Sequence, residues 1–304
     1  MKKDRDDGGG VVLSRADSDI ENLCGFSSGK FTGAGVVFTF ILGVIFWVIF
    51  YLPLYFVHRD NPDNQVLAMF FHGGAENRST IPYYTLFLTC WALAMLLVKY
   101  LKLRTQRKAL ALRIIPDEPD FVLTSATAAE VLNRINVLVE NPQEFVLFDR
   151  ISRALQNLKN LGDVNTVSEC LNTSARNDDE FLGGSYTVLK GFIWAIPVLG
   201  FIGTVLGLAE AVGGFGRVVA AGAGIEELKS ALGGVTNGLS VAFETTLIAL
   251  IAALIVQLLM TFLISREELF LDECADYCHQ SVISRIRSIE TVAVPAAAGE
   301  REGI

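Results

Sequence analysis

Four long apolar runs limit what this chain can fold into more than any other feature. A helix needs about 20 apolar residues to cross a bilayer core that is about 30 Å thick. Runs of about that length without charged residues occur at 36–57, 81–98, 192–209 and 246–264. A soluble α/β protein could bury one such run in its core, but four runs argue against a soluble fold. We therefore expect an all-α membrane protein with four transmembrane helices.

The overall composition agrees with that class. Of the 304 residues, 51% are hydrophobic and only 19% are charged, which excludes a disordered chain. The formal net charge of -8 argues against nucleic acid as a partner, because a phosphate backbone needs a basic surface. The lipid bilayer is the partner that these numbers favour.

The five cysteines are scattered and show neither a disulfide framework nor the spacing of a zinc site. Cys274 and Cys278 share a helix face beside His279, but no fourth ligand is specified, and the surroundings are those of a solvated helix. We expect reduced thiols, no metal site and no cofactor.

The distribution of positive charge predicts the orientation. Five Lys and Arg residues precede the first run, two lie between runs one and two, twelve between two and three, two between three and four, and four follow. The positive-inside rule then places both termini and the long middle segment in the cytosol. The short loops 57–80 and 210–238 would lie outside. The basic cluster from Lys99 to Lys108 follows run two, either as a stop-transfer flank or as an anchor on anionic lipid.

These features divide the chain into five parts. We expect a flexible cytosolic arm at 1–34, without a signal peptide, and a first transmembrane pair within 35–98. A cytosolic helical segment would occupy 99–190, and a second transmembrane pair 191–265. Residues 266–304 would form a cytosolic helix and a disordered tail.

Helix signals place two helices inside the cytosolic segment. Thr127 and Glu130 form a capping-box pattern that predicts the first helix, which Asn141 and Pro142 then end. The same two residues would start the second helix, with Gly162 at its C-terminal cap. The mixed segment 165–180 is interpreted as a connector.

Small residues distinguish the third and fourth runs. Proline kinks a helix, and small side chains let two backbones approach closely. The third run contains Pro197, Gly200, Gly203, Thr204 and Gly207, of which Gly200, Thr204 and Gly207 lie on one face with Ala211. The fourth run has a stripe of Ala242, Thr246, Ala249 and Ala253. Two such helices suit a tightly packed oligomer around a narrow lumen.

The polar residues of these runs are the candidate ion-pathway residues: Thr204, Thr245, Thr246, Glu244 and Glu210. The hydroxyls of Thr204 and Thr246 either line a lumen or bond back to their own helix, and the sequence does not decide between the two. Glu244 lies about 200° around the helix from Thr246, so both cannot face one straight lumen. Glu244 and Glu210 either form carboxylate rings at the outer mouth or are solvated helix-end acids, and Glu244 could instead be a buried acid at a subunit interface.

The strings IPVLGFIGTVLGL and GLSVAFETTLIALIAAL resemble the paired pore helices of the MotA/TolQ/ExbB proton-channel family. The resemblance covers roughly residues 120–265, and it implies a pentamer around two copies of a single-span ExbD/TolR/MotB-like partner with a membrane-embedded aspartate. In this family, ion flow past that aspartate is thought to drive rotation. By resemblance, Thr204 matches the threonine of the GTV motif, Thr246 the threonine that faces the aspartate, and Pro197 the span-three proline of flagellar stators.

The leading hypothesis is therefore a pore-forming subunit of an ion-driven motor in the bacterial inner membrane, carrying H+ or alternatively Na+. The alternative is a non-conducting scaffold or transporter subunit. We do not expect an enzyme, because the apolar runs hold no nucleophile with a base and the three histidines lie outside the predicted core. Those histidines are His58, His72 and His279.

Overall fold

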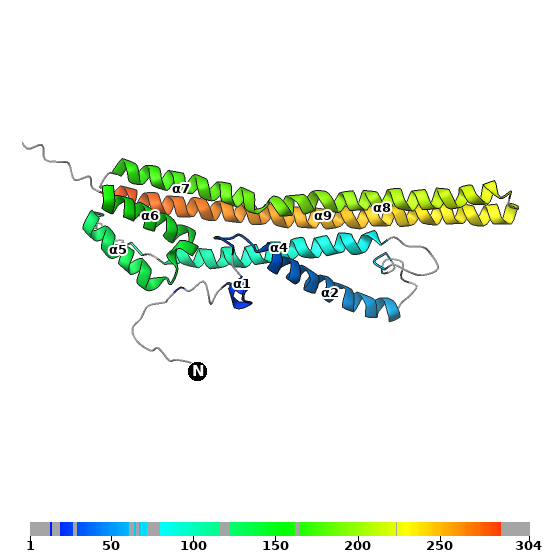
Figure 1. Ribbon diagram of the computed structural model, residues 1–304, viewed down its shortest axis with the longest axis horizontal. Helices are drawn as coiled ribbons and strands as arrows, with labels where there is room; N and C mark the ends of the chain where they lie inside the picture. The colour runs from blue at the N-terminus through cyan, green and yellow to red at the C-terminus, as the bar shows by residue number, and fades with distance from the viewer. Residues whose placement is uncertain are drawn as a thin grey trace, which may run out of the picture. The chain divides into compact units, whose positions relative to one another are not determined.

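The computed structural model describes residues 13, 19–26, 29–60, 64, 67, 69–71, 80–112, 114–115, 122–161, 164–222 and 224–286. Over these residues the regular structure is helical, and the extended pairings are isolated bridges, Leu13 with Val139 and Leu123 with Ile286. In chain order the helices are α1 (Ile20–Leu23), α2 (Val36–Asp60), α4 (Ile81–Ala111), α5 (Ser125–Leu138), η1 (Pro142–Glu144), α6 (Val146–Leu161), α7 (Val164–Ser185), α8 (Thr187–Ala220), α9 (Ile225–Ser281) and η2 (Ile283–Arg285) (Figure 1). The predicted all-α class is confirmed.

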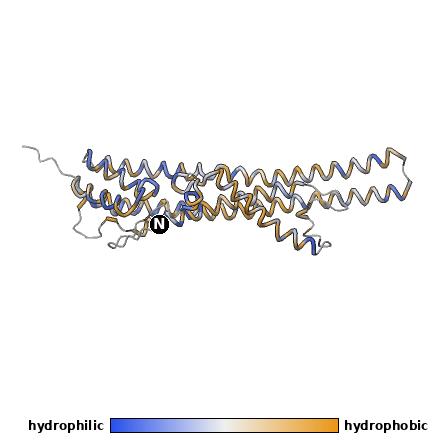
Figure 2. The backbone as a smooth tube through the Cα atoms, turned by 60° about the horizontal axis from the view of Figure 1, so that its bottom comes forward, coloured by the Kyte–Doolittle hydropathy of each residue, from blue (hydrophilic) through white to orange (hydrophobic). Residues whose placement is uncertain are grey.

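Four helical stretches are long and apolar enough to cross a membrane. They are α2, α4, the stretch Val164–Ala220 that contains α8, and the stretch Ile225–Arg285 that contains α9. Each includes one of the four predicted apolar runs, so the number and order of the predicted spans are confirmed by length and composition. Figure 2 shows the hydrophobic residues gathered along these helices, with hydrophilic residues more frequent toward the ends.

The segment 210–238, predicted to be an outer loop, is helical over almost all of its length. α8 continues to Ala220 and α9 begins at Ile225, so only a tight turn joins them. Gly222 makes this turn with a φ of +67°, a conformation that glycine adopts without steric cost. The segment contains many glycines, but only Gly222 has left-handed backbone among the described glycines here.

The segment 165–180 is also not a connector. It lies inside α7, which runs from Val164 to Ser185. Val167 and Leu171 are buried four residues apart, and Leu182 is buried further along. One apolar stripe is enough to hold a mainly polar helix against its neighbours, because only that face needs to leave water.

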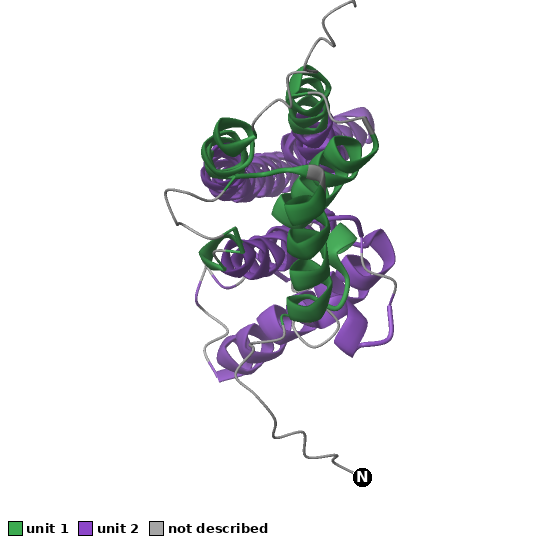
Figure 3. Ribbon diagram, turned by 90° about the vertical axis from the view of Figure 1, so that its left-hand side faces the viewer, with its two compact units in different colours: residues 1–13, 110–176, 273–304 green, residues 14–109, 177–272 purple. Residues whose placement is uncertain are grey.

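The chain divides into two compact units (Figure 3). The first comprises residues 1–13, 110–176 and 273–304, as far as the structure describes them. In this unit α5 packs on α6, and both contribute fully buried apolar side chains, among them Ile135, Phe148, Ile151 and Leu155.

The start of α5 corrects the predicted capping residue. Thr124 is the N-cap, and Thr127 is the third helical residue whose side chain completes the capping box. The motif is therefore present three residues earlier than the sequence pattern indicated. Asn141 and Pro142 do begin a helix, but it is the short η1, and α6 starts only at Val146. Gly162, the predicted C-terminal cap, lies outside the described residues.

The second unit comprises residues 14–109 and 177–272. α2 lies against α4 because Gly43 leaves room for Trp91: a Cβ added at Gly43 would be 2.8 Å from the Trp91 Cα. The Trp91 ring then contacts Phe192 of α8, with ring centroids 4.8 Å apart. Leu88 of α4 packs against the buried cluster of Ile196, Ala249, Ala252 and Ala253.

Part of the predicted flexible arm is packed. Within residues 19–26 and 29–34 the structure places α1 and buries the side chains of Glu21, Phe31 and Thr32. Phe31 meets Phe181 edge-on, with centroids 5.9 Å apart. These contacts, together with an ion pair to α4 described below, hold the segment against the rest of the second unit. Most of residues 1–18 lie outside the described part.

Candidate functional site

α8 and α9 run side by side as an antiparallel pair (Figure 1), and small residues line their contact. A Cβ added at Gly200 would lie 2.5 Å from the Ala249 Cβ, and one added at Gly203 would lie 2.6 Å from the Thr245 hydroxyl oxygen. Neither distance leaves room for a side chain. We call this contact the small-residue seam: Gly200, Gly203, Gly207 and Ala211 of α8 with Gly238, Ala242, Thr245, Thr246 and Ala249 of α9.

The small-residue stripes predicted from the sequence form the two sides of the seam. The stripes of the third and fourth runs face each other within one chain, as Gly207 against Ala242 and Ala211 against Gly238 illustrate. The sequence indicated close packing but assigned it to an oligomer. The structure uses these faces for the pairing of α8 with α9.

Thr204 and Thr246 meet at the centre of the seam. Their hydroxyl groups are hydrogen-bonded to each other. The Thr246 hydroxyl donates across the pair to the carbonyl oxygen of Gly200 at 3.0 Å, and the Thr204 hydroxyl lies 3.2 Å from the carbonyl oxygen of Ala242. Thr204 also reaches its own helix at Gly200, at 3.3 Å. Both side chains are half-buried, and their bonds cross from one helix to the other.

Thr245 differs from its neighbour. Its hydroxyl donates to the carbonyl oxygen of Ala242 on its own helix at 2.8 Å, and the side chain is 3% exposed. It fills the space that Gly203 leaves open. Pro197, the predicted kink residue, is inside α8, which continues through it without ending.

The two candidate acids are not brought together with the threonines. Glu210 is exposed on α8. Glu244 is half-buried on α9, where the Ser240 hydroxyl lies 3.5 Å from its carboxylate. Glu244 is two residues before Thr246 in the continuous helix α9, about 200° around it, and so lies on a different face from Thr246.

Sequence reasoning missed a buried charged cluster at the N-terminal end of α8. The Lys99 ammonium lies 3.4 Å from the Glu267 carboxylate, 2.9 Å from the Ser185 hydroxyl and 4.0 Å from the centre of the Tyr186 ring. The Tyr186 hydroxyl donates to the same carboxylate oxygen at 2.9 Å. Lys99, Tyr186 and Glu267 are each 1% exposed. We call these four residues the junction cluster, because Ser185 ends α7 and Tyr186 precedes α8.

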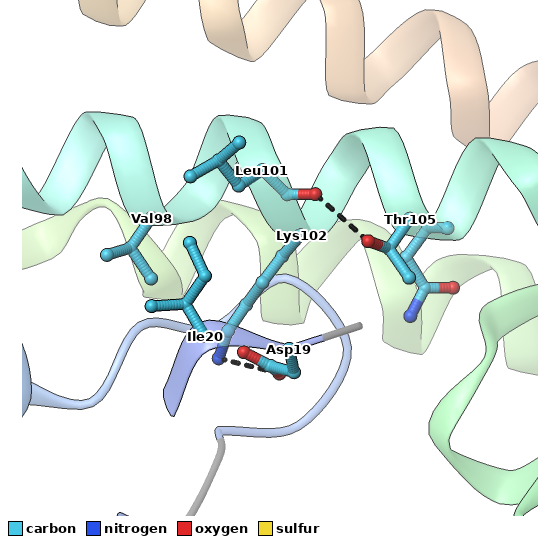
Figure 4. A pocket seen from close by; sticks show the side chains of 7 residues that line it. Asp19, Ile20, Val98, Leu101, Lys102 and Thr105 are labelled. Atoms are coloured by element: carbon cyan, nitrogen blue, oxygen red, sulfur yellow. Dashed lines mark hydrogen bonds and ion pairs between the residues drawn. The ribbon is translucent and has the colours of Figure 1, made fainter. Parts of the chain in front are cut away.

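A second buried ion pair lies one helical turn further along α4. The Lys102 ammonium is 2.6 Å from the Glu21 carboxylate, 2.6 Å from the carbonyl oxygen of Gly33 and 3.6 Å from Asp19. Glu21 also accepts the backbone N–H of Gly35 at 2.7 Å. Figure 4 shows Lys102 reaching Asp19 beside a cavity of about 10 Å³, which is room for about one water molecule.

The basic cluster after run two is therefore split between two environments. Lys99 and Lys102 are buried and paired, whereas Arg104 and Lys108 are exposed. The carboxylate partners Glu21 and Glu267 are far from Lys102 and Lys99 in the sequence, so no local sequence pattern predicts these ion pairs. The one available signal is that a glutamate at 267 continues the buried face of α9 between Leu263 and Phe270.

The fold and these contacts define a multi-span helical membrane protein. Within it, residues 143–274 match the family model described as the MotA/TolQ/ExbB proton channel family, which confirms the predicted resemblance. The matched region contains the seam, the threonine pair and Glu267. Comparison with curated proteins and with solved structures found no match.

Proposed function

We propose that this protein is the pore-forming subunit of an ion-driven motor complex in the bacterial inner membrane. The observation that carries the proposal is the Thr204–Thr246 contact within the segment that matches the proton-channel family. It gives a half-buried pair of hydroxyl groups in otherwise apolar helices, and such groups can order water or a hydrated ion without the cost of burying a charge. The transported ion is H+, with Na+ as the alternative.

The proposed complex is a pentamer around a single-span ExbD/TolR/MotB-like partner that carries a membrane aspartate. The outward faces of α8 and α9 support an assembly, because they expose large apolar side chains such as Trp194, Phe201 and Phe243. These faces are available to lipid and to further copies of the chain, since the small-residue faces are used within each copy. The ion-binding acid would come from the partner, and the part of the half-buried Thr246 side chain that the seam leaves exposed would face it.

Composition of the complex is the first test. The tagged full-length chain would be purified from its own host in detergent and analysed by native mass spectrometry. Five copies with two copies of a small single-span protein would support the motor architecture. A monomer or dimer without such a protein would contradict it, and would favour the non-conducting scaffold or transporter instead.

Ion flux through the purified complex is the second test. In proteoliposomes with an imposed membrane potential, we expect Thr246→Val to lower proton flux about tenfold, the change that corresponds to about 1.4 kcal/mol in a barrier. The matched control is Thr261→Val, because Thr261 is exposed on the same helix and bonds to its own carbonyl at Gln257. Equal flux in both variants would refute a role for the threonine pair.

Glu244 is proposed as an acid of the ion pathway, and Glu210 as its companion at the outer mouth. Their charge would attract cations to the entrance, since rings of carboxylates raise the local cation concentration. We expect Glu244→Gln to lower flux or to weaken the complex. A Glu244→Gln variant with unchanged flux and an unchanged complex would contradict a role for Glu244 in the ion pathway.

A further inference from the structure

The small-residue seam has a weakness: it does not specify one register. Gly200, Gly203 and Gly207 face Ala249, Thr245 and Ala242 in succession. If α8 slid along α9 by one turn, about 5.4 Å, small residues would again face small residues. Packing of small side chains alone therefore distinguishes poorly between neighbouring registers.

At the turn end of the pair, the glycines add little to the choice of register. The glycines near the α8–α9 turn, among them Gly213, Gly216 and Gly233, have no neighbouring atoms within 4 Å of the position a Cβ would occupy. Exposed glycine positions on both helices make no interlocking contact there. The register is therefore set by the tight turn, by the threonine pair or by contacts at the opposite end of the pair.

The junction cluster lies at that opposite end. Its hydrogen bonds and ion pair join specific partner atoms, so they are made in one register only. Tyr186 immediately precedes α8, and its hydroxyl donates to Glu267 of α9 at 2.9 Å. Lys99 adds α4, since its ammonium reaches Glu267 at 3.4 Å and Ser185 at 2.9 Å. A shift of about 5.4 Å would separate all of these partners. It would leave buried charges unpaired, which is strongly unfavourable.

We propose that Lys99, Tyr186 and Glu267 are positioning residues that fix the start of α8 against α4 and α9, and so set the register in which Thr204 meets Thr246. Tyr186 lies 18 residues before Thr204 on α8. That is about 27 Å along the helix, so the three residues act through the helix and not by contact with the ion pathway. The consequence for ion flux rests on the proposed function, whereas the register itself does not.

The physical reason for a buried ion pair at this place is specificity and not stability. Replacing such a pair by apolar residues of similar volume is often neutral or stabilising, while removing one partner is strongly destabilising. We therefore expect the double variant Lys99→Met/Glu267→Met to lose much less stability than either single variant, with the remaining loss due to the buried Tyr186 hydroxyl. We also expect it to populate more than one register.

The experiment compares that double variant with a matched control, Lys108→Met/Glu268→Met. Lys108 and Glu268 lie on the same two helices, α4 and α9, and both are exposed. The protein is the full chain in its native complex and membrane. Both variants carry Cys24→Ser, because Cys24 is the exposed native cysteine among the described residues.

Two cysteine pairs report the register through disulfide formation under mild oxidation. Gly207→Cys with Ala242→Cys joins residues that face each other, since a Cβ at Gly207 lies 3.2 Å from the Ala242 Cβ. Ala211→Cys with Ala242→Cys joins residues one turn apart, because Ala211 faces Gly238. Disulfide formation needs Cβ atoms about 4 Å apart, so each pair is selective for one register.

We expect the double variant to lose disulfide at the first pair and gain it severalfold at the second, while the control matches the parent. Identical disulfide yields in the double variant and the parent would overturn the proposal. So would an equal shift in the control, because the effect would then not belong to the junction cluster.

A milder variant covers the case in which the double variant does not fold. Tyr186→Phe keeps the ring beside Lys99 but removes the hydrogen bond to Glu267. We expect a smaller shift in the same direction, and no shift would overturn the proposal. If the register shifts while the parent complex conducts no ion, the proposed function fails and the positioning role stands.

Discussion

The Thr246 hydroxyl donates a hydrogen bond across the helix pair to the carbonyl oxygen of Gly200, at 3.0 Å. This contact exists because Gly200 has no side chain: a Cβ there would lie 3.2 Å from the Thr246 Cα and 2.5 Å from the Ala249 Cβ. Glycine thus brings the two backbones close enough for a side chain of α9 to reach the main chain of α8.

Substitution of Gly200 tests this dependence on close approach. We expect Gly200→Ala to lower the free energy of unfolding by about 1–3 kcal/mol, the usual cost of overpacking. Thermal unfolding of the purified protein measures the effect. Gly213→Ala is the control, because nothing lies within 4 Å of its added Cβ and alanine favours a helix. A Gly200→Ala protein as stable as the control would contradict the packing in the seam.

Loss of the Thr246 hydroxyl has a smaller expected cost. Hydrogen bonds between membrane helices contribute about 0.6 kcal/mol on average, so we expect Thr246→Val to destabilise the protein by about that amount. Thr246→Ser keeps the hydroxyl and serves as the conservative comparison. Unfolding in a denaturant series would measure the stability of both variants. A serine variant less stable than the valine variant would argue against the hydrogen bond.

Lys102 is expected to be far more sensitive than its exposed neighbour. Lys102→Met leaves the buried carboxylates of Glu21 and Asp19 without their ammonium partner, which costs about 3–5 kcal/mol when a buried pair is broken. Arg104→Met on the same helix should change stability little, because Arg104 is exposed. Limited proteolysis of the segment around Glu21 provides the measurement. Equal protection of that segment in both variants would refute the role of the ion pair.

The cap of α5 offers a fourth test in the other unit. Thr124 accepts the backbone N–H of Thr127, and the Thr127 hydroxyl accepts the backbone N–H of Thr124 in return. We expect Thr124→Ala to cost about 1 kcal/mol, the typical value for an N-cap. Asn133→Ala, at an exposed position inside α5, should be neutral or slightly stabilising. Thermal unfolding of both variants distinguishes a real cap from an incidental threonine.

Much of the helical architecture could be predicted, because the signals involved are local. The apolar runs gave the number and order of the long helices, since the length of a run of apolar residues decides whether a helix can span a bilayer. The small residues of runs three and four indicated close packing for an equally local reason. The family resemblance placed Thr204 and Thr246 within a segment that the family model also matches.

Local signals failed where helix formation depends on neighbours. The glycine-rich segment 210–238 and the polar segment 165–180 have weak intrinsic helix propensity, yet both are helical. Intrinsic propensity differs by only about 1 kcal/mol per residue, and tertiary packing overrides it. The same holds for the arm, where Glu21 is buried because Lys102 is in reach.

The sequence by itself determined the class of the protein, because hydrophobic length and helical spacing are properties of consecutive residues. Only the tertiary structure decided which side chains meet. Thr204 faces Thr246 across 42 residues, and Lys99 pairs with Glu267 across 168. Such partners are selected by the packing of whole helices, where a buried charge or hydroxyl must find a complementary group, and no spacing in the sequence encodes that choice.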